Sequence, residues 1–355
     1  MATVRLQDIA GNYRLADSLA PASQSIAVIK ANAYGHGMLK VARCLQSMAP
    51  AFAVASVDEA VRLRDAGIGK PILVMQGISR ASDLAEAAAG RFWLMLHTQQ
   101  QVEWLLSAKL QDSVGVWLKV DTGMHRLGFS LHDLDRLCDK MCSSFNTRQA
   151  PVLCTHLACA DNIADPMTRL QVETIRDCAG KFHLDLSIAN SAGILFWPES
   201  HAHWNRPGYM LYGQCPSGSF GGDRHGLLPA MTLNSEIIAI RDIAAGEGVG
   251  YGQDWVAQRP SKIGAIAIGY GDGYPRHAPS GTPVLVNGTR VPLAGRVSMD
   301  AICVDLTDHA NAQVGDPVEL WGQNLSVNEV AAAAGTIGYE LLAGLTGRVP
   351  LRHES

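Results

Sequence analysis

The sequence predicts an α/β fold in which an N-terminal (β/α)8 barrel of the TIM type precedes a C-terminal, mostly antiparallel β-domain. From residue 25 to about residue 213, eight apolar, strand-like runs alternate with helix-like segments, as in parallel α/β folds. After about residue 226, strand-like runs joined by turns rich in Gly, Pro, Asp and Asn replace this pattern. We therefore expect a barrel over residues 1–226 and a β-domain over residues 227–355. A doubly wound parallel sheet is the alternative for the first part.

The barrel strands are short apolar runs that suit burial on both faces. They are expected at residues 25–30, 51–55, 71–76, 92–96, 114–120, 152–156, 184–189 and 209–212. Met38, Val41 and Leu45 lie at helical spacing in the first helix, and Ser56 with Glu59 forms a capping box at the start of the second. The five helices predicted in this way cover residues 38–48, 57–66, 99–110, 131–142 and 167–179.

The second part alternates strand-like runs with turn sequences such as Asn287-Gly288 and Gly315-Asp316-Pro317. A single helix is expected near residues 326–334. The strands of this β-domain are expected at residues 232–241, 262–268, 283–286, 301–306 and 317–321.

The composition points to a globular protein with a small-molecule partner. The chain has 355 residues, of which 47% are hydrophobic and 17% charged, and its net charge of -4 comes without a basic stripe, so we expect no nucleic-acid partner. The eight cysteines form no CxxC pair and no zinc-like spacing, which favours free thiols in a reducing compartment and predicts no metal site. The N-terminus lacks an apolar leader and no run is long enough to span a membrane, so the prediction is a cytoplasmic protein.

Candidate functional residues stand where the expected barrel strands end, because the active sites of such barrels lie at the carboxyl ends of the strands. Lys30 follows the first strand, Arg126 the fifth and His156 the sixth, and Arg206 lies next to the eighth. These cations predict a site that binds an anion and handles an electrophile. Lys30 closes a strand of the buried type, where an ordinary ion pair is the alternative to a lysine whose pKa is lowered for chemistry.

The loops after the seventh and eighth strands are the usual phosphate site of this fold. Asn190, Ser191, Gly208 and Tyr209 lie there. Ser191 could equally be a plain helix N-cap, and Gly208 a plain turn residue. A phosphate site combined with a lysine at a strand end suggests pyridoxal phosphate held as a Schiff base.

The segment AVIKANAYGHG at residues 27–37 resembles the cofactor-lysine signature of alanine racemases, the fold-type III pyridoxal phosphate enzymes. Further segments resemble that family in the same order, and together they extend over nearly the whole chain. They are KVDTGMHRLG (119–128), GYG (250–252), IGYGDGYPR (268–276), GRVSMD (295–300) and GYE (338–340). The resemblance implies a cofactor-binding barrel, a C-terminal β-domain and a head-to-tail homodimer in which this β-domain completes the active site of the partner subunit.

The resemblance also implies the reaction, which is the interconversion of L-alanine and D-alanine for peptidoglycan synthesis or D-alanine catabolism. Lys30 would hold the cofactor and act as the base for D-alanine, and Tyr251 of the partner subunit would act as the base for L-alanine. Racemisation needs proton removal on one face and delivery on the other, so two bases are required. By the same resemblance, Arg206 faces the pyridine nitrogen and His156 with Arg206 tunes Tyr251.

Further roles follow from the resemblance. Arg126 would bind the substrate carboxylate together with Met299 of the partner subunit, although an ion pair with Asp121 is the alternative for Arg126. Lys119 would be carbamylated, as in some family members, and would orient Arg126. The resemblance assigns the cofactor to Lys30, Tyr34, His156, Asn190, Ser191, Arg206, Gly208, Tyr209 and Tyr339, and supporting positions to Tyr270 and Asp300.

Two other functions compete with this prediction. A broad-specificity amino-acid racemase would use the same residues on serine or a basic amino acid. A non-catalytic pyridoxal phosphate-binding protein also uses a barrel with a lysine on the first strand, but such proteins lack the C-terminal β-domain. The presence of Tyr251 and Met299 argues against that second alternative.

Overall fold

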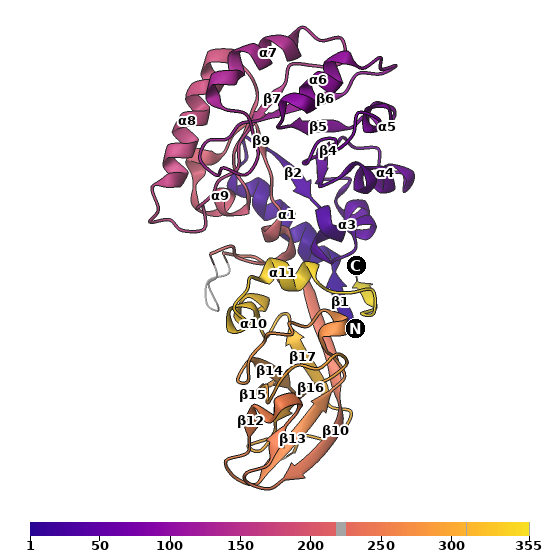
Figure 1. Cartoon of the computed structure of the whole chain (residues 1–355), viewed down its shortest axis with the longest axis vertical. Coiled ribbons are helices and arrows are strands. Elements are labelled where there is room, and N and C mark those ends of the chain that lie inside the picture. The colour runs from indigo at the N-terminus through magenta and orange to yellow at the C-terminus, as the bar shows by residue number, and fades with distance from the viewer. Residues whose placement is uncertain (218–224, 310, 355) are drawn as a thin grey trace. The chain divides into compact units, whose positions relative to one another are not determined.

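The computed structural model describes residues 1–217, 225–309 and 311–354, and Figure 1 labels its elements. The chain divides into two compact units, each with its own packing. The first, which we call the barrel unit, comprises residues 10–33 and 38–211. The second, which we call the β unit, comprises residues 1–9, 34–37 and the described residues from 212 onward.

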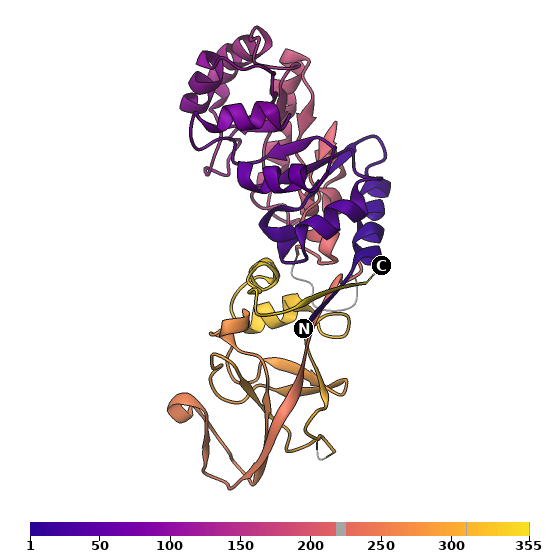
Figure 2. The same cartoon turned by 90° about the vertical axis from the view of Figure 1, so that its right-hand side faces the viewer.

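The barrel unit contains a closed barrel of eight parallel strands that pair in chain order, as predicted. Helices lie around the outside of this ring (Figures 1 and 2). The strands are β2 (Gln24–Val28), β3 (Ala51–Val54), β4 (Ile72–Val74), β5 (Trp93–Leu96), β6 (Gly115–Lys119), β7 (Val152–Cys154), β8 (Leu186–Ser187) and β9 (Trp204–Asn205). The helices are α1 (Leu6–Leu19), α2 (Lys30–Tyr34), α3 (Met38–Leu45), α4 (Val57–Asp65), α5 (Asp83–Ala89), α6 (Gln99–Ser107), α7 (Leu134–Cys142), α8 (Met167–Phe182) and α9 (Ser191–Phe196).

The eighth strand lies earlier in the chain than the sequence pattern predicts. Residues 209–212 form a 3-10 turn, and β9 pairs with β8 and β2 to close the barrel. The apolar run 209–212 is fully buried, so its composition reports burial and not strand pairing. Pro207 follows the true strand closely and has no N–H for a ladder, which helps to explain why the strand is so short. Arg206 nevertheless follows a barrel strand directly.

Tryptophans pack together inside the barrel, near the amino ends of its strands. Trp93 begins β5 and Trp204 begins β9, and their ring centroids are 5.5 Å apart. Trp117 of β6 stands 6.1 Å from each of them. A Cβ on Gly115 would come within 2.2 Å of the Trp93 ring, so glycine is required beside this cluster. The packed amino end leaves the carboxyl ends of the strands for the polar residues.

The β unit is built on an eight-stranded, mostly antiparallel sheet. The N-terminal strand β1 lies between β10 and β18 and is parallel to β18, so both chain ends belong to this sheet (Figures 1 and 2). The strands are β1 (Ala2–Arg5), β10 (Met231–Ile243), β13 (Ser261–Ile266), β14 (Pro283–Val286), β15 (Thr289–Pro292), β16 (Ile302–Asp305), β17 (Pro317–Trp321) and β18 (Leu351–Glu354), with a separate hairpin of β11 (Gly248–Val249) and β12 (Trp255–Val256). Helix α10 (Val327–Ala333) confirms the single predicted helix, and α11 (Gly338–Ala343) was not predicted.

All eight cysteines fall within the described ranges, and each is a free thiol. Within those same ranges, no helix has the length and apolar character that crossing a membrane would require.

Candidate active site

Lys30 begins a left-handed turn at the carboxyl end of β2. Residues 31–34 all have φ between 50° and 55°, although none of them is glycine. Such a conformation costs about 1–2 kcal/mol for each residue other than Asn32, or about 3–6 kcal/mol for the turn, because asparagine adopts it more readily. The Ala33 N–H donates to the Ile29 carbonyl at 2.8 Å, and the Asn32 side chain accepts from the Met38 N–H at 3.0 Å. Unfavourable backbone of this kind persists where the surroundings enforce it, most often at functional sites.

The surroundings of Lys30 favour its neutral form. Burial lowers the pKa of the Lys30 ammonium first, and the positive charges of Arg126 and Arg206 lower it further, whereas Glu59 raises it. The ordinary ion pair that was the alternative for Lys30 is absent among the described residues, because Glu59 binds backbone amides. A neutral amine is the form that attacks a carbonyl carbon.

Arg206 is buried and held rigidly by the strand ends around it. Its guanidinium donates to the Thr155 carbonyl at 2.7 Å, to the Ile188 carbonyl at 3.0 Å and to the Ser187 hydroxyl. Its Nε is buried and has no hydrogen-bond partner among the described residues. A buried donor without an acceptor is costly, so this atom points to an acceptor supplied from outside the chain.

His156 stands beside Arg206 and is held neutral. Its Nδ1 is 3.5 Å from Arg206 Nη2, a long contact in which the imidazole nitrogen accepts. Burial lowers the pKa of His156 well below its ordinary value, and the cations Arg206, Lys119, Arg126 and Lys30 act in the same direction. These electrostatic effects show that barrel closure brings the five predicted basic residues into one site.

Lys119 is a buried lysine at the end of β6. Its ammonium donates to the Val120 carbonyl at 3.2 Å, and only 8% of the residue is exposed. Burial lowers the pKa of Lys119, which Cys154 and Asp121 partly oppose. No carboxylate forms a salt bridge with this lysine in the described parts of the chain.

Arg126 lies exposed on the loop after β6. The alternative for this residue was an ion pair with Asp121, but Asp121 binds His125 instead, with 3.1 Å between Oδ2 and Nδ1. Asp121 Oδ1 also accepts from the backbone N–H groups of Gly123 and His125, so this carboxylate shapes the loop. In the described structure Arg126 has no ion-pair partner, which leaves its guanidinium available to an external carboxylate.

The predicted phosphate residues meet between α9 and the loop after β9. Ser191 Oγ accepts from the Gly208 N–H at 3.0 Å and from the Met210 N–H at 3.2 Å. Asn190 is the N-cap of α9, since its side chain accepts from the Gly193 N–H at 2.9 Å, so Ser191 is not the cap. With both lone pairs of Ser191 Oγ engaged, its hydrogen is left to donate.

Tyr34 packs against aromatic rings of the β unit, to which it belongs. Its ring centroid lies 4.8 Å from that of Tyr212 and 6.1 Å from that of Tyr339, on α11. Burial raises the pKa of Tyr34 to about 12. Its hydroxyl therefore keeps its proton at neutral pH and can act as a hydrogen-bond donor.

Tyr251 and Met299 lie on exposed loops of the β unit. Tyr251 is 70% exposed and Met299 is 51% exposed. Gly250 and Gly252, with φ of 72° and 75°, allow the tight turn that presents Tyr251. In a single chain both side chains are therefore open to solvent.

The loops that carry Tyr270 and Asp300 are tied together. The backbone N–H of Tyr270 donates to the Ser298 carbonyl at 3.0 Å. Arg348 pairs with Asp300 at 2.7 Å and with Asp272 at 3.2 Å. The β unit thus presents these two predicted site loops as one connected surface.

Sequence reasoning missed Gln171, a fully buried residue of α8. Its side-chain oxygen accepts from the Ala158 N–H at 2.9 Å, and its side-chain nitrogen donates to the His156 carbonyl at 3.0 Å and to Thr122 Oγ1 at 3.1 Å. Gln171 therefore fixes the loop of His156 against the loop that leads to Arg126. A buried amide among helical residues has no sequence motif that would reveal these contacts.

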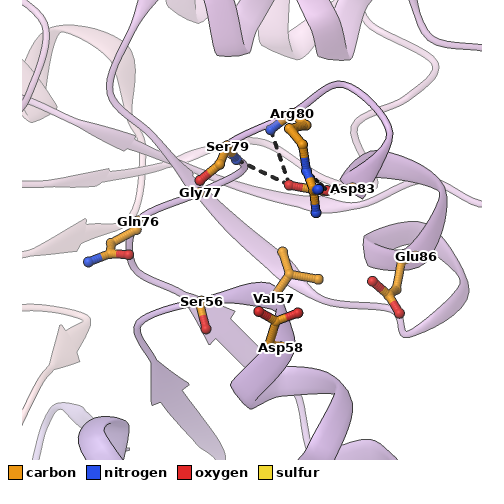
Figure 3. A pocket seen from close by; sticks show the side chains of 9 residues that line it. All are labelled: Ser56, Val57, Asp58, Gln76, Gly77, Ser79, Arg80, Asp83 and Glu86. Carbon is orange, nitrogen blue, oxygen red and sulfur yellow. Dashed lines mark hydrogen bonds and ion pairs between the residues drawn. The ribbon is translucent and has the colours of Figure 1, made fainter.

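A pocket of about 190 Å³ lies at the carboxyl ends of β3 and β4 (Figure 3). Asp83 occupies one side and is already bound by the backbone N–H groups of Ser79 and Arg80 and by the Arg80 side chain. The described residues that line this pocket include no predicted site residue. The pocket is lined by Ser56, Val57, Asp58, Gln76, Gly77, Ser79, Arg80, Asp83 and Glu86.

A (β/α)8 barrel with a lysine at the first strand end, a buried arginine and an attached β unit defines a class of barrel enzymes. Residues 4–216 match the family described as "Alanine racemase, N-terminal domain", and residues 230–353 match "Alanine racemase, C-terminal domain". The chain belongs to the alanine racemase family, and it is an enzyme of the amino-acid racemase class.

Individual relatives agree with this assignment. The chain is 45% identical to the alanine racemase of Chromohalobacter salexigens over 355 residues, which cover 100% of this chain and 98% of the relative. It resembles the crystal structure of biosynthetic alanine racemase from Pseudomonas aeruginosa with a TM-score of 0.96 and 47% identity, covering 100% of this chain and 99% of that one. An alanine racemase structure from Bartonella henselae with covalently bound pyridoxal phosphate has a TM-score of 0.90 and 29% identity, covering 100% and 99%.

Proposed function

We propose that the enzyme interconverts L-alanine and D-alanine with pyridoxal phosphate attached to Lys30. The observation that carries the proposal is the buried Arg206 Nε, a donor with no acceptor among the described residues, in the same site as a lysine whose pKa is lowered. The ring nitrogen of pyridoxal phosphate is an acceptor of the required kind. The residues present therefore fit this cofactor.

Arg206 would hold the ring nitrogen of the cofactor, and Lys30 would bind its aldehyde carbon through Nζ. When bound, pyridoxal phosphate draws electrons from the α-carbon of an attached amino acid and so makes its α-proton removable. Arg206 does not release its own proton at working pH, so the ring nitrogen stays unprotonated. This limits electron withdrawal and disfavours side reactions.

Phosphate binding falls to donors at the end of the Lys30 turn and in later loops of the chain. Ser191 keeps a hydroxyl hydrogen to donate, and its contacts with Gly208 and Met210 hold the loop around Tyr209. Tyr34 keeps its phenolic proton because its pKa is raised. We assign the phosphate to Ser191, Gly208, Tyr209, Tyr34 and Tyr339.

Proton transfer would use Lys30 for D-alanine and Tyr251 of the partner subunit for L-alanine. Two bases on opposite faces meet the requirement of racemisation. The 70% exposure of Tyr251 in a single chain supports its use across a homodimer, as does the exposure of Met299. In this assembly, the barrel domain proposed for residues 1–226 binds the cofactor with the help of Tyr339, and the β-domain proposed for residues 227–355 completes the partner's site. Residues 218–224, next to that boundary, lie outside the described residues.

Substrate binding falls to Arg126, whose guanidinium has no ion-pair partner among the described residues and suits a carboxylate. Lys119 supports Arg126 if its neutral amine adds carbon dioxide, because the carbamate that forms, with loss of a proton, is anionic. Burial and the lowered pKa of Lys119 favour the neutral amine that this addition needs. An intact mass without a carbon-dioxide adduct would exclude the modification.

A panel of L-amino acids tests the substrate, and α-proton exchange in deuterated water tests the chemistry. We expect alanine to be turned over fastest, and equal or faster turnover of serine, arginine or lysine would overturn the assignment to alanine. Wild-type enzyme should exchange the α-proton of both enantiomers. Tyr251→Phe should lose exchange with L-alanine while retaining some with D-alanine, and full racemisation by this variant in both directions would disprove the two-base assignment. The product D-alanine would serve peptidoglycan synthesis or catabolism.

A further inference from the structure

Glu59 connects the carboxyl ends of two neighbouring barrel strands. Its Oε1 accepts from the Ala31 N–H at 2.8 Å, and its Oε2 accepts from the Ala55 N–H at 2.8 Å. Ala31 is the residue after Lys30, and Ala55 directly follows β3. A single carboxylate from α4 therefore fixes the backbone that follows β2 and the backbone that follows β3.

This arrangement differs from the capping box that the sequence predicts. The half of the box made by Ser56 forms, because Ser56 Oγ accepts from the Glu59 N–H at 3.3 Å. In a capping box the Glu59 carboxylate would return to the N–H of Ser56. It binds Ala55 and Ala31 instead. Capping of α4 does not require the contact with Ala31, so that contact needs another explanation.

The contact with Ala31 stabilises the start of the left-handed turn. Ala31 has φ of 51° and is the first of the left-handed residues that follow Lys30. The first N–H groups of a helical turn have no acceptor within that turn. An ionised carboxylate gives a stronger hydrogen bond than a neutral acceptor, which suits a segment of unfavourable conformation.

The charge of Glu59 also acts on Lys30. Arg126 and Arg206 lower the pKa of Lys30, as burial does, and Glu59 raises it. The other basic groups in the same site are His156, held neutral, and Lys119. Glu59 therefore provides the opposing negative charge in a site that is otherwise rich in cations.

We propose that Glu59 is a positioning residue for Lys30: it anchors the turn that directs the lysine side chain, and its negative charge acts on the reacting nitrogen without an ion pair. The inference rests on the proposed function for the chemistry that Lys30 performs. It does not assign Glu59 contact with substrate or cofactor.

The test compares Glu59→Gln with Asp58→Asn in the full-length, cofactor-loaded enzyme. Asp58 is exposed and also lies in the first turn of α4, so its substitution removes the same charge from the same helix end without touching Ala31. The absorbance of the bound cofactor is recorded against pH, since its band follows protonation of the nitrogen that Lys30 contributes. Turnover number and KM for alanine are measured on the same samples.

For Glu59→Gln we expect the midpoint of the absorbance titration to move to lower pH, because an anion that favours the protonated nitrogen is lost. The turnover number should fall about 10- to 100-fold with KM nearly unchanged, as expected when a reacting group is misplaced and substrate binding is not. Asp58→Asn should match wild type in both measurements. Equal midpoints and equal turnover numbers for the two variants would overturn the proposal.

Glu59→Asp separates charge from reach. It keeps the negative charge but is one methylene shorter, so it cannot bridge both amides. We expect its titration midpoint to stay closer to that of wild type while its turnover number falls, and a normal turnover number would refute the anchoring role even if Glu59→Gln does not fold. If wild type itself shows no bound-cofactor absorbance and no α-proton exchange, the proposed function fails, which is a different result.

Discussion

Replacing Ala31 by glycine should stabilise the protein, although glycine usually weakens a helical segment. Ala31 is exposed and has φ of 51°, so the substitution removes no packing and relieves a left-handed alanine. The relief is about 1–2 kcal/mol. Greater freedom of glycine in the unfolded chain takes back about 0.4–1 kcal/mol. The net expectation is a gain of about 0.8 kcal/mol in the free energy of unfolding.

Ala85 provides the matched control, because it is an exposed alanine inside the right-handed helix α5. Ala85→Gly should lower the free energy of unfolding by about 1 kcal/mol. The two variants should therefore lie on opposite sides of wild type and differ from each other by about 2 kcal/mol in the free energy of unfolding. For a unit of this size that corresponds to about 4–8 °C between their midpoints in thermal unfolding.

The assay is thermal unfolding of wild type and both variants at one protein and cofactor concentration, since binding shifts apparent stability. The midpoints should rank Ala31→Gly above wild type and wild type above Ala85→Gly. If Ala31→Gly is destabilised as much as Ala85→Gly, the turn after Lys30 is not left-handed in solution. The argument that this site stores unfavourable backbone conformation would then be wrong.

Two further predictions concern the loops of the site. Gln171→Leu leaves the Ala158 N–H, the His156 carbonyl and Thr122 without their buried partner. The free energy of unfolding measured in urea should fall by about 2–4 kcal/mol, and kcat/KM should fall about tenfold. Unchanged values for both would refute the loop-fixing role. Because the pKa of folded His156 lies below its unfolded value, the unfolded chain binds more protons once the pH falls below about 6.5, and stability is lost with a slope of up to about 1.4 kcal/mol per pH unit. His156→Asn should therefore lose less stability than wild type between about pH 7 and 5, and parallel curves would contradict the buried neutral imidazole.

Much of the candidate site could be predicted because its residues stand at strand ends. Lys30, His156 and Arg206 each follow a barrel strand closely, and strand ends in a barrel meet on one rim. The chemical types of these residues already indicated a site that binds an anion and handles an electrophile. The hydrogen-bond and ion-pair partners around these residues could not be predicted as well. Asp121 binds His125 and not Arg126, and Glu59 reaches Ala31 from a helix that begins later in the chain.

The sequence by itself determined the barrel, the β-domain and the order of the family segments, because periodic apolar residues and short motifs depend on local geometry. Only the tertiary structure decided that β9 precedes Arg206, that the N-terminal strand belongs to the β unit, and that residues 31–34 turn left-handed. These features depend on pairing between distant segments or on backbone conformations that alanine adopts only when its surroundings enforce them. A chain without tertiary contacts carries no local signal for either.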